Sequence, residues 1–336
     1  MKILVTGGAG YIGSVIVARL QARGHAVVVY DDLSRGHAAA VPAGVPLVRG
    51  DVRDATAVRA ALEDGGCEAV VHMAALAEVA ESVARPDWYR SVNEAGTAAV
   101  VRAAVGAGAG RLVFSSTAAV YGAPERTPID EEDPPAPANP YGETKLAGER
   151  LLQQARSRGE LAATALRYFN ACGADGDAGE DHDPESHLIP LALRAARDGT
   201  PIRVFGDDYP TPDGTCVRDY VHVADLADAH IAALEALPKV QGPFNLGTGS
   251  GDSVQTVLDA VERVTGLPLR REIAPRREGD PPVLVAGNMR AAERLGWRPR
   301  RSLTDAVADA WAWMTAHPTG YEHHDSPPAP AGGDLR

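Results

Sequence analysis

The stretch Ile3-Leu4-Val5-Thr6-Gly7-Gly8-Ala9-Gly10-Tyr11-Ile12-Gly13 decides the fold. Its apolar start predicts a strand, its glycines predict a tight turn, and residues Tyr11 to Arg23 predict a helix that ends before Gly24. Glycines in such a turn let the backbone approach a pyrophosphate, and the helix N-terminus offers free N–H groups and a favourable dipole. Glycine spacing alone is weak evidence, because a tight strand-to-helix turn needs glycine without any ligand. The strand before the loop and the helix after it strengthen the interpretation.

An acidic residue, Asp31, ends the second expected strand. A carboxylate there can accept hydrogen bonds from the adenine-side ribose hydroxyls and would repel a 2′-phosphate, so we expect NAD rather than NADP. Arg35 nearby could weaken the preference for NAD over NADP, although a lone arginine in a polar loop is more often only solvated. Asp51, after the third expected strand, is a candidate adenine neighbour, with an N-cap or turn role as the alternative.

Short apolar runs alternate with helix-period stretches through the first half of the chain. We expect strands at Ile3–Thr6, Ala26–Tyr30, Pro46–Val48, Ala69–Met73, Arg111–Ser115 and Ala165–Phe169. We expect helices between them at Tyr11–Arg23, Thr56–Glu63 and Tyr89–Val105. Such alternation predicts an α/β fold with a Rossmann-type, doubly wound parallel sheet.

The pattern changes at about Asn170, where prolines and longer loops become more frequent. Helices are still expected at Val223–Ala236, Ser253–Val264 and Leu303–Met314. We therefore expect a cofactor domain over residues 1–170, a smaller C-terminal α/β substrate-binding lobe over 171–321 and a disordered tail over 322–336. A site between the two parts is expected, at the carboxyl edge of the sheet.

Bulk composition excludes several classes of function. The 336 residues carry 33 basic and 45 acidic side chains, a formal charge of −12, whereas a nucleic-acid binder usually has a basic surplus. Three cysteines lie far apart (Cys67, Cys172, Cys216), which suits a reducing compartment and argues against disulfides or a Cys-rich zinc site. Neither a signal peptide nor an apolar run long enough to span a membrane is evident. We expect a cytoplasmic protein that binds no membrane, no nucleic acid and no metal.

Two reactive side chains lie four residues apart in Tyr141-Gly142-Glu143-Thr144-Lys145. On a helix, positions i and i+4 share a face, so the ammonium can lie close to the phenol. A fixed cation favours the phenolate and would make Tyr141 a usable general base near neutral pH. Upstream, Ser115, Ser116 and Thr117 end an expected strand, and one of these hydroxyls can orient a substrate alcohol towards Tyr141. The alternative is that Ser and Thr simply terminate the strand.

These motifs together resemble a known family. The glycine loop, the run Phe114-Ser115-Ser116-Thr117-Ala118-Ala119-Val120-Tyr121-Gly122 and the Tyr141–Lys145 pair resemble the extended short-chain dehydrogenase/reductase family. Further segments resemble its UDP-glucose (UDP-galactose) 4-epimerase members, namely Leu166–Asn170, Gly206–Pro210, Val217–Val223 and Pro275–Asp280. The resemblance runs from Met1 to about Tyr321, and the order and spacing of the motifs make it specific.

The resemblance implies a redox-neutral epimerisation at sugar carbon 4. Tyr141 would remove the proton of the 4-hydroxyl, Lys145 would bind the nicotinamide ribose and lower the pKa of the tyrosine, and Thr117 would hold the sugar oxygen. NAD would take a hydride from carbon 4, and the 4-keto sugar would turn in the site and take it back. NAD would thus stay bound, and the protein would be a homodimer like many members of the family.

The resemblance also implies binding residues by position. The cofactor-binding residues would be Gly7, Gly10, Tyr11, Ile12, Gly13, Asp31, Asp51, Val52, Ala74, Ala75, Asn93, Tyr141, Lys145 and Tyr168. The substrate-binding residues would be Thr117, Asn170, His187, Leu188, Phe205, Arg218, Arg277, Asp280 and Leu284. The two arginines would neutralise the diphosphate. Taken singly, a lone arginine is usually a surface ion pair, and a phenylalanine is usually core.

Some positions depart from the family pattern. Ala77 replaces a lysine that often touches the cofactor, and His187 stands where some members carry an asparagine. Leu284 occupies the position that gates 2-acetamido sugars and is intermediate in size, so acceptance of N-acetylated UDP-sugars stays open. UDP-glucuronate and UDP-pentose are alternative substrates, and a non-catalytic NAD-binding regulatory protein is a distant alternative. A 4,6-dehydratase is disfavoured, because Ala118 and Ala119 follow Thr117 where that group has an acidic pair.

Overall fold

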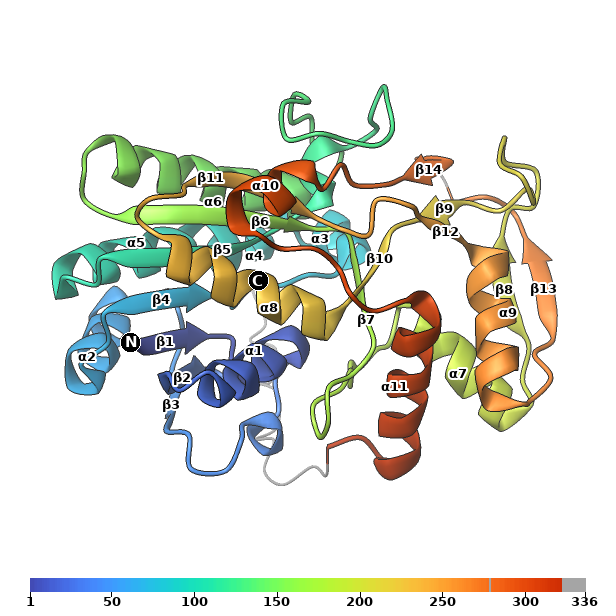
Figure 1. Cartoon of the computed structure of the whole chain (residues 1–336), viewed down its shortest axis with the longest axis horizontal. Coiled ribbons are helices and arrows are strands. Elements are labelled where there is room, and N and C mark those ends of the chain that lie inside the picture. Colours follow the sequence, from blue (N-terminus) through green and yellow to red (C-terminus); the bar gives the residue numbers. More distant parts are fainter. Residues whose placement is uncertain (278, 322–336) are drawn as a thin grey trace, which may run out of the picture.

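The computed structural model of the chain describes residues 1–277 and 279–321, so the tail expected at 322–336 lies outside the described residues. Its centre is a seven-stranded parallel sheet in the order β11-β6-β5-β4-β1-β2-β3 (Figure 1). The strands are β1 (Lys2–Thr6), β2 (Ala26–Asp31), β3 (Leu47–Arg49), β4 (Ala69–His72), β5 (Arg111–Thr117), β6 (Ala162–Tyr168) and β11 (Gly242–Leu246). This arrangement confirms the predicted Rossmann-type sheet.

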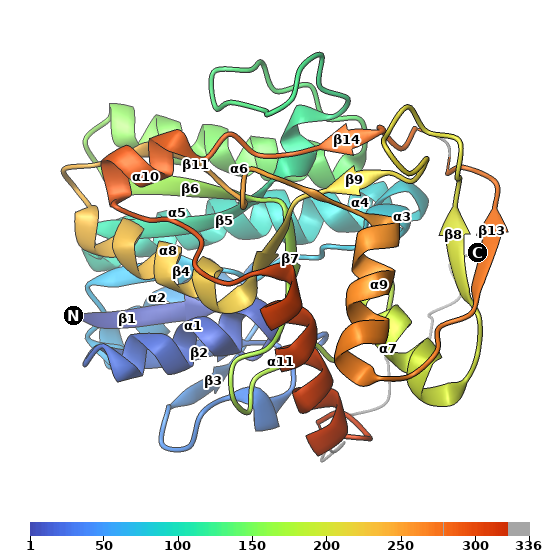
Figure 2. The ribbon, with the colours of Figure 1, turned by 45° about the vertical axis from the view of Figure 1, so that its right-hand side comes forward.

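Helices cover both faces of the sheet (Figure 2). Helices α1 (Tyr11–Ala22) and α8 (Val223–Ala236) pack together on one face and bury one core. Helices α2 (Ala55–Gly65), α5 (Gly96–Ala107) and α6 (Pro140–Ser157) contribute to a second core on the other face. Because apolar side chains point to both faces, the central strands read as continuous apolar runs rather than alternating ones.

The expected elements of the first half are present within a few residues. The helix expected over Tyr89–Val105 is built from α4 (Pro86–Tyr89), a π-helical turn (Arg90–Ala95) and α5. The seventh strand, β11, was not predicted from the sequence. It is a short Gly-Pro-Phe-Asn-Leu segment that pairs with β6 far upstream. Its glycine, proline and asparagine do not favour a strand, so the local sequence does not predict one.

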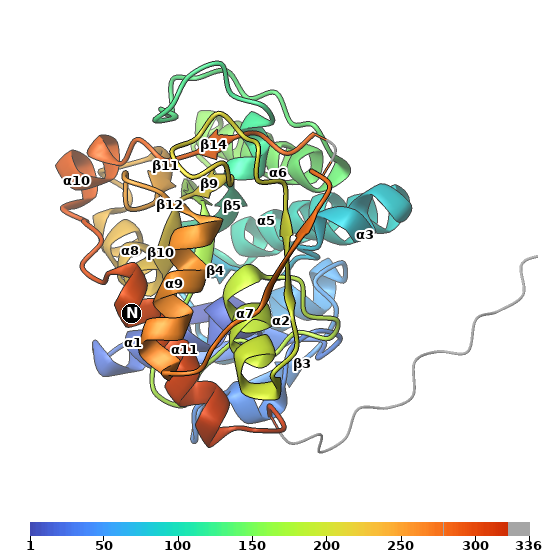
Figure 3. The same cartoon turned by 90° about the vertical axis from the view of Figure 1, so that its right-hand side faces the viewer.

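A smaller unit lies at the right of Figure 1 and faces the viewer in Figure 3. Its core is shared by α7 (Leu188–Asp198), α9 (Val254–Thr265) and α11 (Leu303–Ala316). Three small sheets complete it: β8 (Ile202–Phe205) with β13 (Arg271–Ala274), β9 (Val217–Arg218) between β12 (Asp252–Ser253) and β14 (Val283–Leu284), and β7 (Asn170–Cys172) with β10 (Tyr220–His222). Because α8 and β11 return to the large sheet, the chain passes between the two units more than once.

Short helices complete the described part of the chain. They are α3 (Val79–Ala84), α10 (Met289–Leu295) and the 3-10 turns Ala38–Ala40 and Ala118–Tyr121. Within residues 1–277 and 279–321, none of the helices combines the length and the apolar character that crossing a bilayer requires.

Candidate active site

The carboxyl ends of four neighbouring strands form the floor of the site. Strands β1, β4, β5 and β6 end at Thr6, His72, Thr117 and Tyr168. Thr6 is in register with His72, and Thr117 is in register with Tyr168. Parallel strands present such residues at one edge of the sheet, which is where open α/β sheets bind ligands.

The glycine loop bends back on itself so closely that side chains are excluded. Gly7 has a φ of +69°, and a Cβ there would lie 2.5 Å from the backbone nitrogen of Ala74. A Cβ on Gly13 would lie 2.1 Å from the carbonyl oxygen of Gly7. The loop therefore leaves the N-terminus of α1, which begins at Tyr11, open to a ligand at the sheet edge, and this cradle fits a dinucleotide pyrophosphate. Gly10 caps the helix, and Ile12 packs on the core beside it.

Asp31 lies directly against this loop. Its Oδ2 accepts a hydrogen bond from the Ala9 backbone N–H at 3.0 Å, and its Oδ1 accepts one from Leu33 at 2.9 Å. Burial raises the pKa of the carboxyl, and these two hydrogen bonds oppose that rise. The side chain is thus fixed at the end of β2, beside the loop, as a ribose-binding carboxylate requires.

The side chain of Asn93 links the loop after β4 to helix α6. The Asn93 amide accepts from Leu76 N at 2.8 Å, donates to Leu76 O at 2.9 Å and donates to Thr144 Oγ1 at 3.1 Å. Ala74 touches Gly7, and Ala75 follows it in the same loop. Ala77 is exposed, so the lysine contact that is common at this position is replaced by a methyl group.

Other residues predicted to bind the cofactor lie near the loop or farther along the sheet edge. Val52 is buried against Gly96. Asp51 pairs with Arg53, so its side chain is held towards the surface. Tyr168 lies at the end of β6 and hydrogen-bonds His230 at 2.8 Å. The roles of all these residues stay predictions.

Tyr141 is the second residue of α6. Asn139 caps the helix by accepting a hydrogen bond from Gly142 N at 2.9 Å, and Pro140 occupies its first position, as the sequence predicts. The phenol lies next to the side chain of Thr117 at the end of β5, close enough for Thr117 to lower the pKa of the phenol. The structure thus brings together two of the three predicted catalytic residues, from a helix start and a strand end.

The third residue, Lys145, lies beneath the tyrosine on the same helix face. Its Nζ donates to the Ser115 carbonyl oxygen at 2.9 Å and lies 6.0 Å from the centre of the Tyr141 ring. The side chain is only 3% exposed, and burial lowers the pKa of its ammonium to about 7. The i, i+4 geometry expected from the sequence is therefore present.

The predicted effect of Lys145 on Tyr141 is not found in the chain alone. Burial raises the pKa of Tyr141 to about 12, and the neighbouring Thr117 side chain offsets only part of that rise. Sequence reasoning counted the neighbouring cation but not the burial of the phenol and the ammonium, which disfavours the charged form of each. Phenolate formation near neutral pH therefore needs a further positive charge at the site.

The residues predicted for the nucleotide meet in the smaller unit. Arg218 forms an ion pair with Asp280, and the Arg277 guanidinium lies 4.1 Å from the centre of the Phe205 ring. Leu284 on β14 is in register with Arg218. Leu284 also packs against a cluster that contains residues of the turn after Thr117 and of α6, and its members are Val120, Tyr121, Ile129, Leu146 and Phe169. Leu284 thus connects the residues predicted to bind the nucleotide with the segment that carries the predicted catalytic residues.

Three further predicted substrate residues have different surroundings. Asn170 lies on β7, where its backbone N–H donates to the Asp219 carbonyl oxygen at 2.9 Å. Leu188 begins α7, and His187 caps it with its backbone. The His187 imidazole contacts Glu180 at 2.7 Å and Glu185 at 3.1 Å. Burial alone would lower the pKa of His187, but Glu180 outweighs burial and raises that pKa to about 11.

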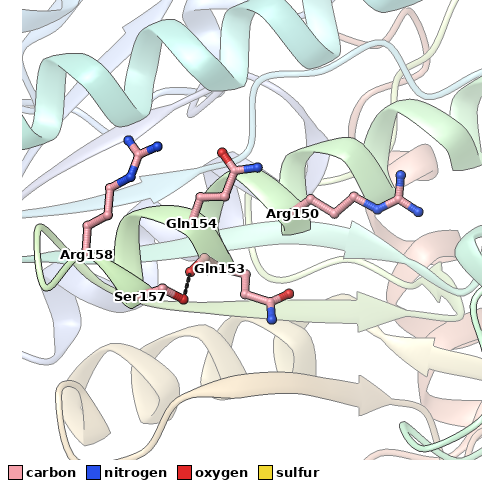
Figure 4. A pocket seen from close by; sticks show the side chains of 5 residues that line it. All are labelled: Arg150, Gln153, Gln154, Ser157 and Arg158. Atoms are coloured by element: carbon pink, nitrogen blue, oxygen red, sulfur yellow. Dashed lines mark hydrogen bonds between the residues drawn. The ribbon is translucent and has the colours of Figure 1, made fainter.

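A surface hollow on the outer side of α6 lies apart from this site (Figure 4). It is lined by Arg150, Gln153, Gln154, Ser157 and Arg158, and the Ser157 hydroxyl donates to the Gln153 carbonyl oxygen at 2.8 Å. Four of them belong to the second half of the helix and Arg158 caps its end, so all lie at least about 13 Å along its axis from Tyr141. The hollow therefore does not contribute to the catalytic constellation.

Sequence reasoning missed a buried polar network that holds α6 on the sheet. Arg167 on β6 donates to both oxygens of Glu149, at 2.8 and 2.6 Å, and to the Tyr121 hydroxyl at 2.7 Å. Ser116 donates to Glu149 at 2.5 Å, and Tyr121 donates to the Asn245 side chain on β11 at 2.7 Å. The only signal in the sequence was Arg167, a charged residue inside the otherwise apolar segment of β6, and a lone charge does not tell which residues it pairs with.

The chain matches the model of the NAD dependent epimerase/dehydratase family over residues 3–247. The chain belongs to this family. The family's cofactor confirms the prediction of NAD, and the loop geometry described above fits that cofactor. The family includes both epimerases and dehydratases, so the reaction must be inferred from the site and from individual relatives.

Individual relatives are similar over nearly the whole chain. A UDP-glucose 4-epimerase of Streptomyces lividans is 49% identical over 324 residues, which cover 96% of this chain and 98% of the relative. A UDP-glucose 4-epimerase of Brucella ovis solved with NAD is 44% identical with a TM-score of 0.89, covering 93% and 97% of the two chains. A UDP-glucose 4-epimerase of Bifidobacterium longum solved with NAD+ and UDP is 35% identical with a TM-score of 0.90, covering 96% and 100%.

Proposed function

We propose that the chain is a UDP-hexose 4-epimerase that interconverts UDP-galactose and UDP-glucose. The observation that carries the proposal is the convergence of Tyr141, Thr117 and Lys145 at the carboxyl edge of a sheet whose first loop fits NAD. The relatives that resemble the chain over almost its full length are UDP-glucose 4-epimerases, which supports the same reaction and the same substrate.

The geometry supports a reversible proton transfer at one sugar hydroxyl. The side chains of Thr117 and Tyr141 lie close together, so an alcohol inserted between them would give its proton to the ionised form of Tyr141 and keep Thr117 as a donor. NAD, when bound, supplies the acceptor for the hydride from sugar carbon 4 and a positive charge beside the phenol. When the 4-keto sugar takes the hydride on its other face, Tyr141 returns the proton, and the stereocentre is inverted.

The same site disfavours elimination. A dehydratase must remove a proton and a hydroxyl from neighbouring sugar carbons, and that chemistry requires an acid and a base beside the threonine. The residues after Thr117 are Ala118 and Ala119, which form a 3-10 turn and offer only methyl groups. The site thus has the groups for oxidation and reduction at one carbon but none here for elimination.

We place the UDP moiety in the smaller unit. Arg218 and Arg277 would hold the diphosphate, Phe205 would line the uracil pocket, and Asp280 would hold the ribose of uridine. Leu284, which packs between these residues and the turn after Thr117, would limit the space for a 2-acetamido group. We also propose a homodimer on the basis of the family, to be tested by light scattering of the purified chain.

The test is the incubation of purified protein with UDP-galactose without added NAD. Chromatography should detect UDP-glucose, at an equilibrium that is reached equally well from UDP-glucose. A parallel panel of UDP-N-acetylgalactosamine, UDP-glucuronate and UDP-xylose identifies the preferred sugar. Stoichiometric bound NAD without turnover of any of these sugars would instead favour a regulatory NAD-binding protein.

Replacing Arg218 with methionine should weaken substrate binding more than turnover. A lost charged hydrogen bond of about 1.5–3 kcal/mol corresponds to a rise in KM for UDP-galactose of about 10- to 150-fold. The matched control is Arg203→Met, because Arg203 is exposed on β8 of the same unit. Equal KM values for the two variants would show that Arg218 serves only its ion pair with Asp280.

A further inference from the structure

A second cluster of chemically active side chains lies between β7 and α7, outside the catalytic constellation. Glu180, His182, Glu185 and His187 each offer one ligand atom, and these four atoms lie within 4.8 Å of one another. The side chains of Glu180 and Glu185 are only 7% and 1% exposed, although both are carboxylates. Two buried carboxylates so close together need a positive counter-charge, which either protonated imidazoles or a bound cation would supply.

The distances within the cluster resemble those between ligands of one metal ion. Nδ1 of His187 and Nδ1 of His182 lie 2.7 and 3.1 Å from the same atom, Oε1 of Glu180. Oε1 of Glu185 lies 3.1 Å from Nδ1 of His187. In a tetrahedral site with metal–ligand bonds of about 2.0–2.1 Å, neighbouring ligand atoms are roughly 3.3 Å apart. Small side-chain rotations would therefore open space for an ion among these atoms.

An independent observation also points to a missing ligand. Among the residues that the structure describes, Oε2 of Glu185 is buried and has no hydrogen-bond partner. The other oxygen of the same carboxylate accepts from Ser186 N and His187 N, each at 2.8 Å, and also lies 3.1 Å from Nδ1 of His187. An unpartnered buried carboxylate oxygen costs on the order of 1–3 kcal/mol or more, so a partner that residues 1–277 and 279–321 do not supply is expected there.

Protons alone satisfy the cluster poorly. If both histidines were protonated, two positive rings would lie with their centres 5.4 Å apart, and both would direct Nδ1 to the same oxygen of Glu180. Oε2 of Glu185 would still lack a donor. One divalent cation would balance the two carboxylates and bind both imidazole nitrogens in their neutral form.

We propose that Glu180, His182, Glu185 and His187 form a binding site for a first-row divalent cation, with Zn²⁺ as the best match. Two imidazoles and two carboxylates suit Zn²⁺, whereas Mg²⁺ and Ca²⁺ prefer oxygen ligands alone. This proposal departs from our expectation from sequence that no metal is bound. That expectation considered cysteine spacing and overlooked the pattern Glu-x-His-x-x-Glu-x-His.

The position of the site indicates a structural role. The segment over residues 173–187 crosses the glycine loop: Tyr11 donates to the Gly173 carbonyl oxygen at 2.6 Å, and the rings of Tyr11 and His182 lie 6.2 Å apart. Ser186 donates to Glu78 at 2.7 Å, at the start of α3. An ion in the cluster would thus fix this segment over the N-terminus of α1.

The test uses the full-length chain, freed of any affinity tag and stripped with a chelator. Isothermal titration with ZnCl₂ and elemental analysis after gel filtration should find about one Zn²⁺ per chain. The melting temperature should rise with added Zn²⁺ and fall again with excess chelator. Neither measurement depends on epimerase activity, so failure here and failure of the proposed function are distinguishable.

Two variants and a control assign the site. Glu185→Gln keeps the size of the side chain, and His182→Gln removes one imidazole; each should weaken Zn²⁺ binding at least about tenfold. The control, His25→Gln, removes an imidazole that faces Glu235 outside the cluster and should bind Zn²⁺ like the parent chain. Unchanged affinity in both cluster variants would overturn the assignment.

A measurement on the unmodified chain guards against misfolded variants. Co²⁺ in a four-coordinate site of nitrogen and oxygen ligands absorbs visible light strongly, and Zn²⁺ should displace it and abolish the bands. A stripped parent chain that takes up neither Co²⁺ nor Zn²⁺ at micromolar concentration would overturn the proposal and leave two protonated histidines as the counter-charges of the cluster.

Discussion

Replacing Tyr141 with phenylalanine is expected to slow the conversion of UDP-galactose by at least about 10²–10⁴-fold, the usual contribution of a positioned acid–base group. The substitution keeps the ring, and therefore the packing of α6 on the sheet. It removes the hydroxyl that would accept the proton and that lies next to Thr117. Because Tyr141 would act on bound substrate, the loss should appear in kcat rather than only in KM.

The matched control for this prediction is Tyr89→Phe. Tyr89 is also a buried tyrosine, but its hydroxyl donates to the Glu78 carbonyl oxygen at 2.7 Å and not to the catalytic residues. Both variants should keep bound NAD and a melting temperature close to that of the parent chain. A Tyr141→Phe enzyme that works within about threefold of the Tyr89→Phe enzyme would exclude Tyr141 as the proton-transfer group.

The position of this tyrosine was predictable from the sequence, whereas its electrostatics were not. The i, i+4 spacing is a local feature, so the shared helix face of Tyr141 and Lys145 followed from it, and the structure adds the Asn139 cap at the start of the helix. The pKa of each group depends on how much water surrounds it, which the whole fold determines. Burial raises the pKa of Tyr141 to about 12 and lowers that of Lys145 to about 7, so both groups favour their neutral forms.

The fold, too, was predictable from the sequence only in part. Strands β1, β2, β4 and β5 are apolar runs that are buried on both faces, and their pattern alone predicts a parallel sheet. Strand β11 and helix α8 join that sheet from far along the chain, and no local pattern tells which sheet a distant strand will extend. Long-range pairing of this kind also explains why the sequence did not tell that Arg167, Glu149 and Asn245 belong to one network.

Replacing Glu149 with alanine is expected to lower the free energy of unfolding by about 3–5 kcal/mol. The side chains of Glu149 and Arg167 are only 10% and 4% exposed, so removal of the carboxylate leaves a buried guanidinium without its counter-charge. Arg167 would keep its hydrogen bond to Tyr121, but two of its N–H groups would lose their acceptor. A buried pair can contribute little net stability while the loss of one partner is costly, because the remaining charge is not solvated.

Denaturant unfolding of the NAD-saturated protein measures this effect, with Glu143→Ala as the control on the same helix. Glu143 is exposed, and its pairing with Arg90 is loose at 3.8 Å, so its loss should change stability by less than about 1 kcal/mol. The network also fixes α6 against Ser116, one residue before Thr117. Glu149→Ala should therefore reduce kcat even where the protein is fully folded. Equal stability of the two variants would mean that water reaches Arg167, and the network would then not be what holds Tyr141 over Thr117.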